Sequence, residues 1–346
     1  MIRIVVCQTP LHFFLCLTLL PPSDAQTILV FVEESDVNER LVTAIQALHR
    51  ASLIRLPGNR NHSSKHARFL QKYRNVRQLK RDPRIAGADE LLIFNDTTPE
   101  GQYLMDVVAR RNGRIALGED GVATYALGGV IPSGRLNRWL GKLLFGLWWA
   151  PGERIGTSAR IGHVHASFPH RLRNDVAVGR TLTSLVPIVR DDLPDALQDL
   201  AFEFAQGASL CLVPLIASVG IEHARRFVMA MNADGVPLVI KFHPRESEEN
   251  MGHLLSAVDA VNASIAPSSM PAEMLYALTE NCPTVIGFRS SALHIIAALY
   301  PRARVRYYEF SARDEGGQWL SFYDSLGLTA WRSATEGSHL PGVVPR

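Results

Sequence analysis

Short apolar runs alternate along the chain with longer stretches in which apolar residues recur every three or four positions. In the first half, four apolar runs predict strands, at residues 2–7, 27–32, 90–94 and 114–117. The periodic stretches predict helices at residues 11–20, 37–48, 101–111 and 136–149. This alternation is typical of a parallel sheet covered by helices.

The second half repeats the pattern. Its apolar runs predict strands at residues 209–213, 237–242 and 284–287, and its periodic stretches predict helices at residues 221–233, 251–260, 272–279 and 292–299. We expect the segment 191–200 to connect the two halves. A length of 346 residues suits two domains. We therefore expect two Rossmann-like α/β domains, at residues 1–188 and 189–346.

The amino-terminal 20 residues resemble a signal peptide in having Arg3 before an apolar stretch. Gln8, Pro10 and His12 interrupt that stretch, and no small-residue cleavage site follows it cleanly. A buried strand followed by a helix fits the segment better.

Composition narrows the class of protein. Apolar residues make up 47% of the chain and charged residues 20%, which is typical of a globular protein. A net charge of +3 does not indicate nucleic-acid binding. The cysteines, Cys7, Cys16, Cys211 and Cys282, are scattered without a metal-ligand spacing. These features favour a reduced, cytoplasmic setting.

Polar clusters follow five of the predicted strands, at residues 8–10, 95–98, 118–121, 243–246 and 289–291. Ligands of open α/β sheets bind beyond the carboxyl ends of the strands. Two such domains facing across a cleft would suit a transferase. In the first domain, the acceptor or sugar candidates are Gln8, Thr9, Asn95 and Asp96.

The second domain holds the candidates for phosphate binding. Ser290 and Ser291 open a predicted helix, where backbone N–H groups and hydroxyls suit a phosphate, although serine is also an ordinary helix cap. Strand alternation places Lys241 and His243 on one face, where they suit a departing phosphate. A solvated lysine and a structural histidine are the alternative.

The tripeptide Glu119-Asp120-Gly121 follows the strand predicted at 114–117. Adjacent carboxylates repel each other, which raises one pKa toward that of a general base. Asp-Gly is also a common turn dipeptide, and a turn is the alternative.

Together and in this order, these motifs resemble those of bacterial sialyltransferases of the lipooligosaccharide sialyltransferase and capsular polysialyltransferase group. That group has an acidic D/E-D/E-G motif, then an HP motif and a Ser/Thr pair. The opening Cys7-Gln8-Thr9-Pro10-Leu11-His12 is also similar to its first strand and loop. The resemblance covers most of the chain, and it is weakest at residues 128–200 and after Phe310.

The resemblance implies a GT-B glycosyltransferase with an acceptor-side first domain and a donor-binding second domain. Asp120 would be the base, oriented by Glu119, and His243 would stabilise the leaving phosphate. The implied CMP-sugar ligands are Lys241, Pro244, Glu273, Ser290 and Ser291. The implied reaction is inverting transfer of sialic acid from CMP-sialic acid to a cell-surface glycan hydroxyl, with no metal or other cofactor.

Two alternatives remain open. The scaffold could use another CMP-nonulosonic acid or another nucleotide sugar, or the protein could bind envelope polysaccharide without catalysis. The basic segment 60–84 could attract anionic lipid or glycan, or form a solvated loop and helix face. Residues 136–149 suit either an interfacial helix on the inner face of the cytoplasmic membrane or a core or lid helix. His163, His165 and His170 are expected in a loop, with a structural or acceptor-facing role.

Overall fold

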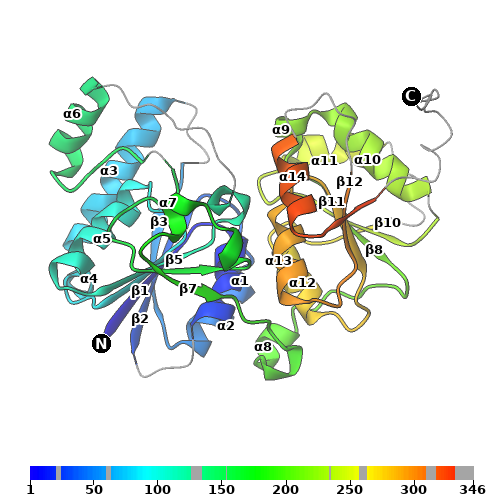
Figure 1. Cartoon of the computed structure of the whole chain (residues 1–346), viewed down its shortest axis with the longest axis horizontal. Coiled ribbons are helices and arrows are strands. Elements are labelled where there is room, and N and C mark those ends of the chain that lie inside the picture. Colours follow the sequence, from blue (N-terminus) through cyan, green and yellow to red (C-terminus); the bar gives the residue numbers. More distant parts are fainter. Residues whose placement is uncertain are drawn as a thin grey trace. The chain divides into compact units, whose positions relative to one another are not determined.

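The computed structural model describes residues 1–20, 25–59, 64–125, 135–152, 154–233, 235–256, 263–308 and 317–331. The chain divides into two compact units, Met1–Ile188 (unit 1) and Val189–Arg346 (unit 2). Each unit is built around its own parallel sheet (Figure 1). The α/β fold expected from the alternating pattern is therefore confirmed.

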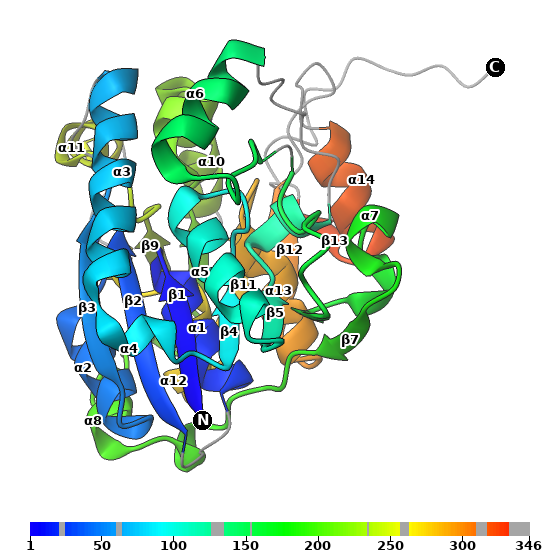
Figure 2. The ribbon, with the colours of Figure 1, turned by 90° about the vertical axis from the view of Figure 1, so that its left-hand side faces the viewer.

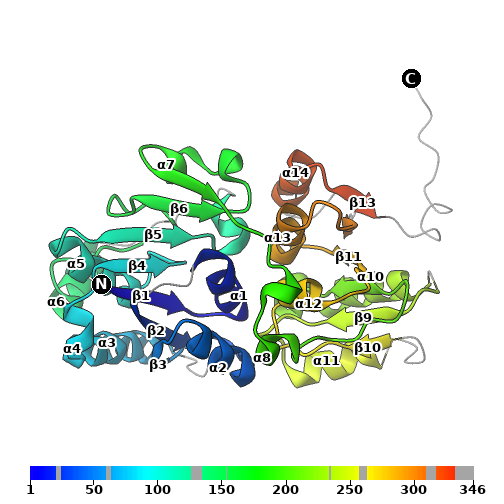
Figure 3. The ribbon, with the colours of Figure 1, turned by 90° about the horizontal axis from the view of Figure 1, so that it is seen from below.

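The described part of unit 1 forms a seven-stranded sheet in the order β3-β2-β1-β4-β5-β6-β7. Figure 3 shows these strands side by side. The bounds are β1 (Ile2–Cys7), β2 (Gln26–Glu33), β3 (Ser52–Pro57), β4 (Glu90–Ile93), β5 (Arg114–Gly118), β6 (His163–Ala166) and β7 (Thr181–Ser184). The central strands are almost wholly buried, because helices cover both faces.

The helices of unit 1 are α1 (Pro10–Leu19), α2 (Glu39–Leu48), α3 (Lys65–Arg81), α4 (Pro83–Ala86), α5 (Pro99–Arg110), α6 (Arg135–Phe145) and α7 (Asn174–Ala177). Figure 1 shows α1 and α2 on one side of the sheet and α3 and α5 on the other. Local sequence sets where they begin. Pro10 opens α1, while the side chain of Thr98 accepts a hydrogen bond from Gly101 N–H and caps α5.

The described part of unit 2 forms a six-stranded sheet in the order β10-β9-β8-β11-β12-β13. The bounds are β8 (Ser209–Leu212), β9 (Leu238–Lys241), β10 (Ala263–Ile265), β11 (Thr284–Gly287), β12 (Val305–Tyr308) and β13 (Thr329–Trp331). Figure 1 shows α10 (Ile221–Ala233) and α11 (Glu248–Leu255) on one side of the sheet. The other side carries α12 (Ala272–Leu278), α13 (Ser291–Leu299) and α14 (Gly317–Ser325). The short helices α8 (Asp195–Gln198) and α9 (Ile216–Val219) are the remaining α-helices of the described residues in unit 2.

In both sheets the sequence order of the strands reverses near the centre. In unit 1 the strand order turns between β1 and β4, and in unit 2 between β8 and β11. At such a point the connections leave the carboxyl edge toward opposite faces of the sheet, which leaves a crevice for a ligand. The motifs singled out from the sequence follow the strands around these two points.

Several sequence predictions need correction. His163 and His165 lie on β6 rather than in a loop, because they alternate along the strand with Val164 and Ala166, which are buried in the sheet. Within the basic segment 60–84, Lys65–Arg81 form the 17-residue helix α3, in agreement with the helix face given as an alternative. The helix predicted at 136–149 ends at Phe145, and the strand predicted to reach Phe242 ends at Lys241. Residues 257–260 of another predicted helix lie outside the described residues.

Candidate functional site

A histidine and an aspartate meet at the carboxyl edge of unit 1. The Nε2 atom of His12, on the first turn of α1, lies 3.1 Å from Oδ1 of Asp120, just after β5. The backbone N–H of Gln8 donates to Nδ1 of His12 over 3.0 Å. Because a backbone N–H can only donate, the proton of the neutral imidazole is on Nε2, where it is donated to Asp120.

The surroundings of His12 fix its ring. The ring stacks on Phe94 with centroids 4.3 Å apart and planes 11° apart, and the side chain is only 1% exposed. The carboxylate of Asp120 is 25% exposed and thus reaches solvent. His12 therefore has the environment of a residue that positions Asp120, and sequence reasoning missed this role. The sequence signal for this role was the position of His12, four residues after Gln8, which itself follows the carboxyl end of β1.

Glu119 has a different environment from its neighbour. Its carboxylate is fully buried, and it accepts hydrogen bonds from the N–H and the hydroxyl of Ser167, both 2.6 Å away. The hydroxyl of Tyr125 is a third donor. Burial and the Glu119 charge raise the pKa of Tyr125 well above its ordinary value. Glu119 thus ties the end of β5 to the end of β6, while Asp120 faces outward.

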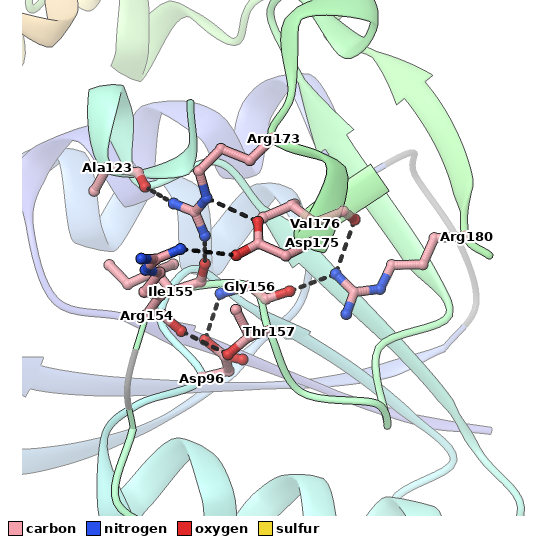
Figure 4. Close-up of polar contacts among 10 residues, drawn as sticks. All are labelled: Asp96, Ala123, Arg154, Ile155, Gly156, Thr157, Arg173, Asp175, Val176 and Arg180. Atoms are coloured by element: carbon pink, nitrogen blue, oxygen red, sulfur yellow. Dashed lines mark hydrogen bonds and ion pairs between the residues drawn. The ribbon is translucent and has the colours of Figure 1, made fainter. Parts of the chain in front are cut away.

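The loop after Asp120 is held by a second set of contacts. Gly121 adopts a left-handed φ of 60°, which a side chain would disfavour, and opens a short 3-10 helix (Gly121–Thr124). The hydroxyl of Thr124 accepts from the N–H of Asp120 over 2.9 Å. Arg173, which is almost buried, donates to the carbonyl of Ala123 over 2.6 Å (Figure 4). The position of Asp120 is therefore set from both sides.

The predicted acceptor-side residues occupy several environments. Asp96 is buried, and one of its oxygens accepts from the N–H of Gly156 over 2.6 Å (Figure 4). Its other oxygen accepts from the N–H of Ser158 over 2.9 Å. Burial raises the pKa of Asp96. The Oδ1 atom of Asn95 accepts from the N–H and hydroxyl of Thr97. These contacts hold loops beside β4, and contact with a sugar stays a prediction for both residues.

Gln8 and Thr9 lie closer to the His12–Asp120 pair. Gln8 is nearly buried, and besides its bond to His12 its carbonyl accepts from the hydroxyl of Ser35 over 3.4 Å. Thr9 precedes α1 without a side-chain capping bond, and its carbonyl accepts from the N–H of His12.

In unit 2, Lys241 is a buried cation at the end of β9. Its Nζ donates to the carbonyls of Phe242 and Ser268, at 2.8 and 3.1 Å. Burial lowers the pKa of Lys241 to about 8, against the opposing charge of Glu273. Glu273 is also buried, on the first turn of α12. The structure thus brings together two residues 32 positions apart that were both predicted to hold nucleotide, and it places both beneath the surface.

His243 lies two residues after β9 in a turn with Pro244. Its Nδ1 accepts from the N–H of Arg245 over 3.1 Å, so the proton of the neutral ring is on Nε2. Burial, aided by the charges of Arg245 and Lys241, lowers the pKa of His243 to about 4. The ring is therefore neutral near pH 7 and offers Nε2–H as a hydrogen-bond donor.

Hydrogen bonds to the side chain of Glu246 hold the turn around His243 in place. This buried carboxylate accepts from the N–H of Ile216 over 2.6 Å and from the side-chain amide of Asn250 over 2.8 Å. These bonds connect the segments that follow β8 and β9, so the His243–Pro244 turn is fixed relative to the neighbouring strand.

Ser290 and Ser291 begin α13, immediately after β11. Arg289 adopts a left-handed φ of 51°, which is uncommon for a residue with a side chain and often marks a functional turn. The hydroxyl of Tyr323 accepts from Ser290 N–H and donates to Ser290 C=O, both over 3.0 Å. Ser290 is the N-cap residue of α13, yet its hydroxyl makes no capping bond. The carboxyl edge of unit 2 therefore presents the first turn of a nine-residue helix directly after β11, the strand that pairs with β8.

Comparison with known proteins identifies the fold. No protein-family model and no curated protein sequence matches the chain. Among solved structures, it is similar to an α/β-galactoside α-2,3-sialyltransferase of Photobacterium phosphoreum, with a TM-score of 0.57 and 11% identity over 94% of this chain and 95% of that one. A Photobacterium damselae sialyltransferase fragment, described as its GT-B domain, gives a TM-score of 0.55 and 13% identity over 95% and 98%. Staphylococcus aureus MnaA bound to UDP gives 0.54 and 10% over 97% and 85%.

The chain thus has the two-domain GT-B fold. Identities of 10–13% establish this architecture and leave the reaction to be argued from the residues. Within the described ranges, no helix is long and apolar enough to span a membrane. Nor do the described residues contain three or more His, Cys, Asp or Glu grouped to hold a metal ion.

Proposed function

We propose that this protein is an inverting sialyltransferase that moves sialic acid from CMP-sialic acid to a hydroxyl of a lipooligosaccharide or capsular glycan. The observation that carries the proposal is the His12–Asp120 pair, which holds an outward-facing carboxylate at the carboxyl edge of unit 1. The resemblance of the motifs to sialyltransferases and the names of two structural neighbours support the choice of sugar.

In this reaction Asp120 removes the proton from the acceptor hydroxyl. The acceptor oxygen then forms a bond to the anomeric carbon while the bond from that carbon to the phosphate oxygen breaks. The His12 bond leaves Oδ2 of Asp120 as the oxygen that takes the proton, because Oδ1 already accepts from Nε2. Attack opposite the leaving group inverts the anomeric centre.

CMP leaves with the electron pair of the broken bond, so negative charge grows on its phosphate. A neutral His243 donates Nε2–H to that phosphate, and the first turn of α13 at Ser290 and Ser291 adds backbone donors. A leaving monophosphate carries less charge than a diphosphate, so these groups suit it without a metal. In this proposal Lys241 and Glu273 do not touch the phosphate. They form a buried pair of opposite charges that supports the nucleotide site from inside unit 2.

The direct test is to incubate the full chain with CMP-sialic acid and galactose-terminated acceptors in the presence of EDTA. We expect release of CMP together with a sialylated product. Asp120→Asn should abolish product while CMP binding persists, and His243→Ala should weaken both transfer and CMP binding. Absence of product over a broad acceptor panel contradicts the proposal.

Nucleotide choice separates this proposal from other enzymes that share the fold. Thermal shifts with CMP, UDP and GDP should show stabilisation by CMP, because only a nucleotide that binds the folded state raises the melting temperature. Stabilisation by UDP alone would instead favour a UDP-sugar enzyme. Glycan binding with no nucleotide effect would favour a polysaccharide-binding protein.

A further inference from the structure

The helix α6 shows an unusual division of its faces. Its buried side consists of Gly141 and Phe145, one turn apart. A Cβ atom on Gly141 would lie 2.2 Å from the ring of Trp149, so this glycine permits close contact with that ring. Phe145 packs against Phe69 and Tyr73 of α3, with ring centroids 5.1 and 6.4 Å apart. Figures 1 and 2 show α6 alongside α3.

The opposite side of α6 is apolar and exposed. Trp139 is 62% exposed, Leu143 67% and, just after the helix, Leu147 90%. Leu140 and Leu144 of α6 and Leu70 of α3 are exposed as well. Single exposed leucines are ordinary, but exposed apolar residues that share one side of a helix, as Trp139, Leu140, Leu143 and Leu144 do by helical spacing, indicate a binding surface. We call these six residues the α3–α6 apolar face.

Basic residues share the two helices with this face. The 17 residues of α3 include seven Lys or Arg and no Asp or Glu. Arg74, Arg77 and Arg81 are exposed at a spacing that forms one stripe, in the row next to the α6-contacting Phe69 and Tyr73. On α6, Arg138 and Lys142 are one turn apart and exposed.

Anchoring contacts hold the two helices together. The Nζ atom of Lys80 donates to the carbonyl of Phe145 over 3.3 Å. The same ammonium lies 5.8 and 5.9 Å from the ring centres of Tyr103 and Trp148. The apolar face is thus presented by a fixed helix pair, so binding would not require the pair to form first.

We propose that the α3–α6 apolar face docks the protein onto an anionic lipid bilayer. Leucine and tryptophan side chains enter the boundary between headgroups and acyl chains, while the arginines of α3 and the basic residues of α6 pair with anionic headgroups. Charge complementarity selects this occupant, since ten Lys or Arg and no acid are found on α3 and α6. The proposal concerns binding alone and does not depend on the reaction proposed above.

Sedimentation with lipid vesicles tests this surface in the full chain. We expect binding to phosphatidylcholine vesicles containing about a third phosphatidylglycerol, and little binding to phosphatidylcholine alone. The double variant L143E/L147E should bind at least about 10-fold more weakly, because burying each leucine is a major part of insertion. The triple variant R74Q/R77Q/R81Q should lose about 100-fold, at about fivefold for each charge.

Matched controls keep the test specific. Val178→Glu changes another exposed apolar residue of unit 1, 77% exposed, and Arg302→Gln changes an exposed arginine of unit 2. Both should bind vesicles like the parent, and all variants should keep its thermal unfolding midpoint. Failure to bind anionic vesicles, or equal losses in the controls, overturns the proposal. It is also overturned if L143E/L147E retains vesicle binding, or if that variant instead dissolves a dimer of the chain.

Discussion

Nε2 of His12 and Oδ1 of Asp120 lie 3.1 Å apart although the two residues are 108 positions apart in the sequence. The sheet brings them together, because α1 follows β1 while Asp120 follows β5, with β4 between the two strands. His12 is a positioning residue in the proposed reaction, and Asp120 is the base.

Substitution of His12 should affect turnover more than binding. His12→Phe keeps a ring that can stack on Phe94 but removes the bond to Asp120, and we expect kcat to fall by about 10- to 100-fold. Asp120→Asn should lower kcat by about 1,000-fold or more. Steady-state kinetics with a soluble acceptor measures both, and the KM for CMP-sugar should stay within a few-fold. A fall in kcat/KM due to KM alone would contradict the positioning role.

Glu119 and Asp120 should differ in what they support. Glu119→Gln leaves a buried site with three donors and one fewer acceptor oxygen, so the free energy of unfolding should fall by about 2 kcal/mol. Asp120→Asn should change it by less than about 1 kcal/mol, because its carboxylate is partly exposed. Urea unfolding followed by circular dichroism compares the two. Equal losses of stability would contradict this division.

The pH dependence of nucleotide binding should report on His243. The N–H of Arg245 occupies Nδ1 and the pKa of the ring is about 4, so the ring should stay neutral when CMP binds, and the contribution of His243 to affinity should not change with pH above about pH 5. Calorimetric titration from about pH 5 to about pH 8 measures the trend, and the ratio of parent to His243→Gln affinities removes the titration of CMP itself. A ratio near one would contradict contact between His243 and the phosphate, and a ratio that rises as pH falls would show that the ring binds the phosphate as an imidazolium.

Lys241 should make the protein more stable at alkaline pH. Burial lowers its folded-state pKa to about 8 from 10.5, so between these values the unfolded chain holds more protons than the folded one. The free energy of unfolding therefore rises with pH across this window, by up to about 3 kcal/mol from this group. The difference between the parent and Lys241→Met should change by this amount between the two ends. A constant difference would show that Lys241 is not buried as a cation.

Gly287 tests how closely β11 must approach β8. A Cβ atom there would lie 2.8 Å from Cβ and 3.1 Å from the carbonyl oxygen of Leu212. Gly287→Ala should cost about 1–3 kcal/mol of stability, and it should weaken CMP binding because β11 leads to Ser290. Gly252→Ala is the control, since nothing lies within 4 Å of its Cβ position in α11 and helix propensity favours alanine by up to about 1 kcal/mol.

The sequence predicted best what depends on local pattern. The bounds of β1, β11 and α10 match the prediction, because apolar runs and helical spacing are read from neighbouring residues. The strand β6 was missed, since His163 and His165 are polar and the strand is recognised only by its pairing with β5 and β7. β10 was missed as well, because it is three residues long with two of them exposed.

The candidate site was predicted in part. The motif residues do follow the strands around each reversal of order, as expected from the position of polar clusters after apolar runs. The partners of those residues were not predictable. Ser167 on Glu119 and Tyr323 on Ser290 are contacts between distant segments that no local pattern encodes.

The hydrogen bond from Gln8 N–H to Nδ1 of His12 has a consequence for the fate of the proton that Asp120 takes in the proposed reaction. A relay that passed this proton from Asp120 to His12 would need the imidazole to gain a second proton. Its only unprotonated nitrogen, Nδ1, already accepts a hydrogen bond from the backbone. The stacked ring cannot turn away while Phe94 covers it. In the proposed reaction the proton therefore leaves from Oδ2 of the partly exposed Asp120 into water, so each turnover ends with exchange to bulk solvent rather than with storage inside the protein.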